Sequence, residues 1–212
     1  MKNEYSTILD TSEIVYEDRR SKFISRAKPV SSEKDAVSFI NFIKEKHRDA
    51  THNVYAYSVN EDGVLLQRFT DDGEPSGTSG KPTLEAINRL GLLNIVVVTT
   101  RYFGGTLLGT AGLIRAYGKS AKLAIEEAKI VKMVYRTRLK IICEYTMLGM
   151  LQNLVIRQGY SIENIDYNEN VDMFVLVPKE KLESFMKKVI NETNDRVLLE
   201  KLDDVYVKEL LK

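Results

Sequence analysis

The chain's hydrophobic and polar residues recur with two periods, one typical of strands and the other typical of helices. Apolar residues at every second position predict a strand, because successive strand side chains point to opposite faces. Apolar residues three and four positions apart predict a helix that buries one face. In the first 128 residues these patterns predict two strands within 13–30, a helix from residue 31 or 32, strands at 53–60 and 64–70, a helix at 82–90, a strand at 94–100 and a helix at 110–128.

Turn and cap residues agree with these elements. Asp62 and Gly63 form a dipeptide that favours a tight hairpin turn between two strands. Pro82 stands in the first turn of the next predicted helix and Gly91 just past its end, which matches the usual preferences at helix ends. The run NIVVVTT at 94–100 is continuously apolar and β-branched, which predicts a strand buried on both faces.

The carboxyl-terminal part has a pattern of its own. Residues 129–143 alternate over a length that is unusual for one strand, so we expect one domain to end and another to begin there. The expected domains are 1–134 and 135–212. Helices are predicted at 145–158 and 179–191, and strands at 160–167, 171–178 and 197–209. This order is that of a ferredoxin-like βαββαβ domain, so the predicted class is α+β with two domains.

Composition and charge narrow the kind of protein. A formal net charge of +1 over 212 residues argues against a surface that is basic throughout, but it allows a local basic face. The single cysteine, Cys143, excludes an intrachain disulfide and a thiolate zinc cluster. The amino terminus lacks the apolar core of a signal peptide, and no apolar run approaches the ~18 residues of a membrane span. We therefore expect a cytoplasmic, soluble protein without membrane contact.

Two glycine-rich loops carry most of the unusual chemistry. The first, TDDGEPSGTSGKP at 70–82, sets three carboxylates beside three glycines, and the second, TTRYFGGTLLG at 99–109, carries an arginine and two aromatic residues. Glycine-dense loops are used where the backbone needs positive φ or approaches a neighbour closely. We expect the two loops to fold against each other and to form a cleft. The expected cleft-lining residues are His52, Asp71, Asp72, Glu74, Gly77, Thr78, Gly80, Gly104 and Gly105.

Familiar catalytic and cofactor motifs do not fit these loops. A nucleotide-binding P-loop needs glycine at position 75 and a hydroxyl residue at position 82, but both are proline. The second loop does not match the G-x-G-x-x-G dinucleotide motif. The carboxylates lack EF-hand spacing, and the serines lack the G-x-S-x-G elbow. We therefore assign no catalytic residue, no cofactor and no metal.

The helix predicted at 110–128 separates its apolar residues from its cations. Because no acidic residue occurs between positions 101 and 125, the cationic side is either a plain solvated face or a surface that faces an anion. The helices after the two glycine-rich loops also begin with unpaired N–H groups, which attract anions. Neighbouring aromatic residues could stack on bases. The expected anion- or RNA-binding residues are Lys81, Arg101, Arg115, Lys119, Lys122, Tyr102 and Phe103.

Three segments resemble motifs of the IMPACT family, and in particular of its bacterial, YigZ-type members. They are DATHNVYAY at 49–57, FTDDGEPSGTSGKP at 69–82 and VVVTTRYFGGTLLGTAGLIRAYG at 96–118. The resemblance implies an amino-terminal α/β domain similar to the second domain of ribosomal protein S-five. It also implies a carboxyl-terminal domain similar to the last domain of elongation factor G. Eukaryotic relatives regulate translation by binding a ribosome-associated activator of a stress kinase.

The resemblance and the cationic face together predict a non-catalytic binding protein of the translation machinery. Its expected partner is RNA or a ribosome-associated protein. Two alternatives stay open. One is an enzyme that acts on a phosphorylated substrate in the cleft, using His52, Asp71, Asp72, Glu74 and Arg101. The other is a protein-interaction adaptor.

Overall fold

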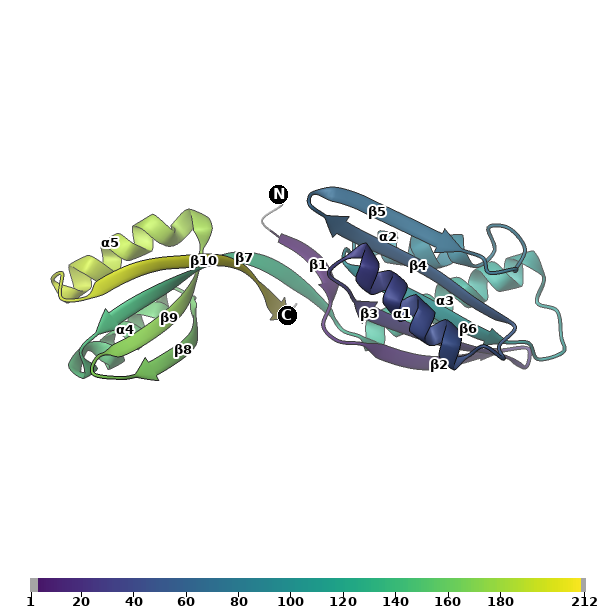
Figure 1. Cartoon of the computed structure of the whole chain (residues 1–212), viewed down its shortest axis with the longest axis horizontal. Coiled ribbons are helices and arrows are strands. Elements are labelled where there is room, and N and C mark those ends of the chain that lie inside the picture. The colour runs from purple at the N-terminus through teal and green to yellow at the C-terminus, as the bar shows by residue number, and fades with distance from the viewer. Residues whose placement is uncertain (1–3, 211–212) are drawn as a thin grey trace. The chain divides into compact units, whose positions relative to one another are not determined.

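The computed structural model describes residues 4–210 and shows two compact units (Figure 1). Of the described residues, 4–133 and 208–210 belong to the amino-terminal unit, and 134–207 belong to the carboxyl-terminal unit. No helix in the described range is long and apolar enough to cross a membrane. The predicted boundary between residues 134 and 135 stays a proposal.

The amino-terminal unit is built on one antiparallel sheet with the strand order β2-β3-β6-β4-β5. Helix α1 covers one face, and α2 and α3 cover the other (Figure 1). The elements of this unit are β1 (Glu4–Ile8), β2 (Ser12–Asp18), β3 (Ser21–Pro29), α1 (Glu33–Lys46), β4 (His52–Glu61), β5 (Val64–Thr70), α2 (Gly80–Arg89), β6 (Ile95–Tyr102) and α3 (Gly109–Glu127).

Strand β6 lies at the centre of this sheet, as its apolar run predicts. Val96 and Val98 point to the α1 side, where they join a core that includes Phe39 and Ile40. Val97 points to the opposite side and packs in the core that α2 and α3 complete. Because helices cover both faces, the strand needs no polar alternation, and the predicted burial on both faces is confirmed. Arg101 lies near the end of this buried strand, at the edge of the sheet where β6 ends.

The carboxyl-terminal unit has the βαββαβ order of a ferredoxin-like domain, as predicted. Its strands lie in the order β10-β7-β9-β8, and its core packs α4 and α5 against the sheet. Strand β1, which the sequence patterns do not predict, also pairs with β7, whose first residues, 130–133, belong to the amino-terminal unit. The elements are β7 (Ile130–Cys143), the 3-10 turn η1 (Tyr145–Met147), α4 (Leu148–Arg157), β8 (Ser161–Tyr167), β9 (Val171–Pro178), the 3-10 turn η2 (Lys179–Lys181), α5 (Leu182–Thr193) and β10 (Leu198–Leu210).

Candidate functional site

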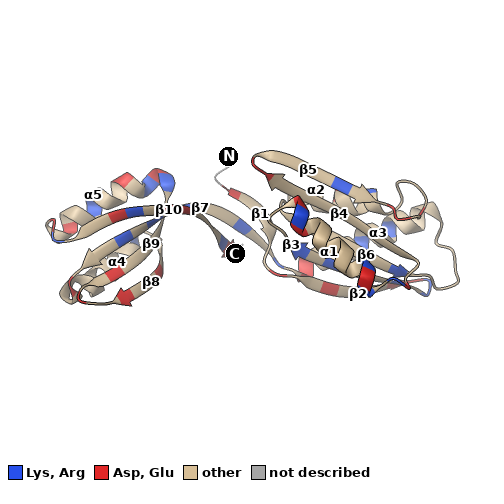
Figure 2. Cartoon of the chain, viewed as in Figure 1, with Lys and Arg blue, Asp and Glu red and all other residues tan. Residues whose placement is uncertain are grey.

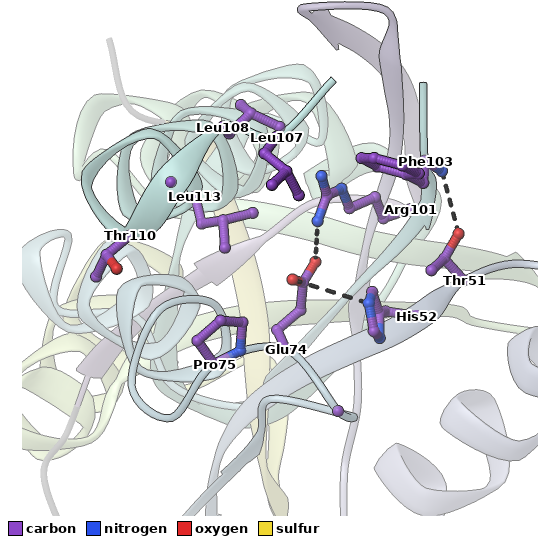
Figure 3. Close-up of a pocket in the computed structure, with 12 residues that line it drawn as sticks. Thr51, His52, Glu74, Pro75, Arg101, Phe103, Leu107, Leu108, Thr110 and Leu113 are labelled. Atoms are coloured by element: carbon purple, nitrogen blue, oxygen red, sulfur yellow. Dashed lines mark hydrogen bonds and ion pairs between the residues drawn. The ribbon is translucent and has the colours of Figure 1, made fainter. Parts of the chain in front are cut away.

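The two glycine-rich loops meet beside the starts of β4 and α3, where they line an open cavity of about 430 Å³ (Figure 3). One part of its wall is polar and the other is apolar. The polar side chains are Thr51, His52, Glu74, Arg101 and Thr110, and the apolar ones are Pro75, Phe103, Leu107, Leu108 and Leu113, with backbone from Gly73 and Gly109. The other predicted cleft residues shape the loops without lining this cavity; they are Asp71, Asp72, Gly77, Thr78, Gly80, Gly104 and Gly105.

Asp71 organises the first loop and the start of α2. Its carboxylate accepts hydrogen bonds from the backbone N–H groups of Gly77 at 2.8 Å, Ser79 at 3.1 Å and Gly80 at 2.9 Å, and from the Ser79 hydroxyl at 2.7 Å. Burial alone raises the pKa of Asp71, but these donors outweigh it and hold the pKa below its ordinary value. The chain's own carboxylate therefore occupies the anion position at the start of α2. Lys81, in the first turn of this helix, is exposed.

Asp72 fixes the loop to the rest of the unit. One carboxylate oxygen lies 3.0 Å from Lys44 Nζ on α1, and the other accepts the backbone N–H of Asn53 at 2.6 Å. Thr78 closes the loop from within, because its hydroxyl donates to the carbonyl of Pro75 at 2.7 Å. These contacts give Asp72 a structural role in loop geometry.

Glu74 and Arg101 form a buried ion pair at the floor of the cavity. Arg101 is 5% exposed and Glu74 is 8% exposed, and Arg101 Nη1 lies 2.7 Å from Glu74 Oε1. The hydroxyl of Tyr117 on α3 donates to the same oxygen at 2.7 Å. Burial and the charge of Glu74 raise the pKa of Tyr117 well above its ordinary value, so the hydroxyl keeps its proton and stays a donor. Arg101 Nη2 also donates to the Ser21 hydroxyl at 3.2 Å.

His52 is held between the loop and the ion pair. Its Nδ1 donates to the carbonyl of Asp72 at 2.7 Å, since a carbonyl oxygen can only accept. Its Nε2 lies 3.8 Å from Glu74 Oε2. The second oxygen of Glu74 therefore faces an imidazole ring, and Figure 3 shows both side chains converging on the cavity.

The two neighbouring aromatic residues of the second loop have different environments. The hydroxyl of Tyr102 bonds His47 Nδ1 at 2.9 Å and Asp49 at 3.2 Å, which ties this residue into a polar network. Phe103 is 45% exposed at the cavity rim, and its ring centre lies 5.5 Å from the Arg101 guanidinium carbon. Its backbone N–H donates to the Thr51 hydroxyl at 3.1 Å (Figure 3). Phe103 is therefore the aromatic residue presented to solvent.

Glycine is required in the second loop for two separate reasons. A Cβ at Gly104 would lie 2.0 Å from the carbonyl carbon of Arg20, so the backbone itself occupies the space. Gly105 has φ of +80°, a conformation that side chains with a Cβ disfavour. In the first loop Gly80 approaches Thr70 closely, and Gly77 has φ of +76°. Because Gly104 has no Cβ, the second loop can pack directly against the backbone of the β2–β3 turn.

The cations of α3 have partners that the local sequence does not reveal. Arg115 Nη2 lies 3.5 Å from a carboxylate oxygen of Asp18 at the end of β2, and Lys119 Nζ lies 4.8 Å from the centre of the Tyr16 ring. Lys122 lies 3.5 Å from Glu126, one turn later. Because Arg115 and Lys122 are more than 60% exposed, these pairs are surface contacts that a partner can compete for.

Tyr117 and Ser21 are site residues that the sequence patterns do not indicate. Tyr117 falls on the apolar arc of its helix, where it looks like an ordinary core residue. The one available signal is its hydroxyl, because a buried hydroxyl needs a hydrogen-bond partner. Within residues 4–210, no group of three or more histidine, cysteine, aspartate or glutamate side chains is arranged to hold a metal ion.

Comparisons with known proteins cover nearly the whole chain. Residues 19–125 match the family model described as the Impact N-terminal domain, and residues 141–196 match a domain of unknown function (DUF1949). The IMPACT family member YvyE of Bacillus subtilis is 36% identical over 196 residues, which is 92% of this chain and 90% of YvyE. The IMPACT family member YigZ of Escherichia coli is 33% identical over 83% of this chain and 87% of YigZ. A crystal structure described as that of a hypothetical protein is 29% identical, with a TM-score of 0.61 over 96% of this chain and 99% of that chain.

Proposed function

Because the chain belongs to the IMPACT family, we propose that it is a non-catalytic binding protein of the translation machinery that contacts single-stranded RNA. The link to translation rests on what the family resemblance implies. The RNA contact rests on the arrangement of charge in the amino-terminal unit. The cavity and the cationic side of α3 form the proposed contact surface.

The contacts that the three loop carboxylates make within the protein support binding over catalysis. Asp71 caps α2, Asp72 ties the loop to α1 and β4, and Glu74 neutralises Arg101. A general base or a metal ligand needs a carboxylate with an oxygen available to substrate or metal. Here Asp71 and Asp72 use both of their carboxylate oxygens to hold the loops, and Glu74 uses one of its oxygens for Arg101 and Tyr117. Internal pairing also lessens the repulsion that three acids would exert on a phosphate backbone.

Exposed cations occur on both helices of this face, α2 and α3. Figure 2 shows lysine and arginine along α3, and Arg115 and Lys122 project from it at positions where their side chains are well exposed. A Cβ at Gly118 would lie 3.9 Å from Cβ of Pro82, so α2 and α3 touch at that point, and Lys81, the residue before Pro82, is exposed. Such exposed cations on a nearly neutral chain are suited to phosphate contacts.

The test is a salt titration of binding to a single-stranded oligoribonucleotide. Each lysine or arginine contact with a phosphate contributes about 0.7 to the slope of log affinity against log salt. We expect the triple variant Lys81→Ala, Arg115→Ala, Lys119→Ala to bind more weakly than wild type and to lose about two units of slope. Arg101 is left in place, because it is buried and its loss would disturb folding.

The matched control removes the same charge elsewhere. Lys181, Lys187 and Lys188 lie on exposed positions around α5 in the carboxyl-terminal unit. Their replacement by alanine should leave the slope near its wild-type value. If the folded α2–α3 variant keeps the wild-type slope, or if both variants lose the same amount of slope, the proposed contact surface is wrong.

A further inference from the structure

The first turn of α3 leaves its backbone N–H groups available at the edge of the cavity. Within the described chain no side chain caps this helix, and its first turn has no acidic residue. The start of α2 differs, because the carboxylate of Asp71 accepts the N–H groups of Ser79 and Gly80. Gly109 and Thr110, the first residues of α3, line the cavity (Figure 3). The free N–H groups and the helix dipole therefore favour an anionic group at this point of the cavity.

Arg101 gives a second, independent indication of a ligand. It lines the same cavity and is buried, and its Nε–H is the one buried side-chain polar group among the described residues that has no hydrogen-bond partner. Glu74 and Ser21 already bind the two terminal nitrogens. Because buried donors are almost always satisfied, the remaining N–H favours a ligand that brings an oxygen acceptor into the cavity.

The rim of the cavity offers an apolar surface for a flat ring. Phe103 is half exposed there, and Leu107, in the same loop, is 80% exposed. Glu74 is the one acid among the residues that line the cavity. Arg101 lies 2.7 Å from one of its oxygens and offsets its charge, which limits its repulsion of an anion.

We infer that this cavity binds one nucleotide unit, with its phosphate at the first N–H groups of α3 and its base against Phe103. The inference deepens the proposed RNA-binding function and rests on it. A volume of about 430 Å³ lies within the range of roughly 300–1,000 Å³ typical of small-molecule sites. The unit can belong to single-stranded RNA or to a free nucleotide, because both present the same phosphate and base.

The inference is tested with the full chain and a variant that should fold at least as well as wild type. Thr110 is exposed, and Thr110→Asp places a carboxylate in the first turn of α3, where the helix dipole stabilises it. This internal anion competes with phosphate for the same N–H groups. We expect Thr110→Asp to weaken binding of uridine 5′-monophosphate and of a ten-nucleotide oligouridylate by about tenfold or more. Thr110→Asn, the uncharged control, should stay close to wild type.

The substitution Phe103→Leu tests whether the base of the nucleotide packs against the ring of Phe103. This variant should weaken the binding of the oligouridylate and of uridine 5′-monophosphate, but it should leave the binding of inorganic phosphate unchanged. If RNA binds with a salt slope set by the α2–α3 cations while Thr110→Asp and Phe103→Leu bind like wild type, the nucleotide site is overturned and the proposed function stands. If the monophosphate binds and depends on Thr110 while RNA does not bind, the site is supported as a free-nucleotide site and the RNA function fails. Binding of neither probe to wild type overturns both.

Discussion

Glu74→Ala is expected to lower the free energy of unfolding by about 3–5 kcal/mol, the cost of removing one partner of a buried ion pair. Arg101 would keep its charge in the interior without the carboxylate that now lies 2.7 Å away. The hydroxyl of Tyr117 would lose its acceptor at the same time. Urea denaturation of the full chain, followed by circular dichroism, measures this change. The decrease in the free energy of unfolding should appear in the transition in which the amino-terminal unit unfolds.

Two further variants make this result specific. Glu85→Ala removes an exposed acid that lies 3.7 Å from Arg89 on α2, and it should cost no more than about 0.5 kcal/mol. The double variant Glu74→Leu, Arg101→Met should lose much less than Glu74→Ala, because apolar residues of similar size often replace a buried pair without penalty. A loss for Glu74→Ala as small as that for Glu85→Ala would show that Arg101 does not depend on Glu74.

Gly104→Ala is expected to destabilise the amino-terminal unit by at least the upper end of the about 1–3 kcal/mol usual for overpacking. The new Cβ would lie 2.0 Å from the carbonyl carbon and 2.1 Å from the carbonyl oxygen of Arg20. These are backbone atoms of the β2–β3 turn, so no side-chain rotation can make room for the methyl group. The second loop or the turn would have to move, and the cavity beside them would change shape.

Gly105→Ala provides the matched comparison. Gly105 has positive φ but nothing within 4 Å of an added Cβ, so alanine should cost only about 1–2 kcal/mol of conformational strain. Gly63, with φ of +86° and the same open surroundings in the β4–β5 turn, should behave alike. Equal losses at Gly104 and Gly105 in denaturation experiments would contradict the close approach to Arg20.

The sequence predicts most of the fold because most elements carry their own periodic pattern. It misses β1, since EYSTI at Glu4–Ile8 has no clear alternation and gains its strand conformation by pairing with β7, far along the chain. It does not predict the single long strand β7 (Ile130–Cys143), because residues 129–143 are interpreted as the end of one domain and the start of the next. That strand pairs with β1, β9 and β10. Partners so distant in sequence leave no local signal in the strand itself.

The site is predictable only as a pair of loops. Glycine density indicates correctly that the loops meet, because positive φ and close approach are local requirements. The pairing of Glu74 with Arg101 joins residues 27 positions apart and depends on the sheet bringing them together. Asp18, the partner of Arg115, is 97 positions away in the sequence. The lack of acidic residues close to Arg115 in the sequence therefore does not mean that Arg115 has no acidic neighbour in the structure. Local patterns identify residue types, and tertiary packing decides which charges remain for a partner.

RNA contact at this cavity is tested most directly by ultraviolet crosslinking of the full chain to a single-stranded oligouridylate, with the modified residue mapped by mass spectrometry. Phe103 stands at the rim with its ring half exposed, so the adduct is expected on the peptide that contains it. Phe103→Leu should lose that adduct, and the triple α2–α3 variant should reduce it in proportion to its weaker binding. Adducts confined to the carboxyl-terminal unit, or no adduct where binding is saturated, would contradict the account.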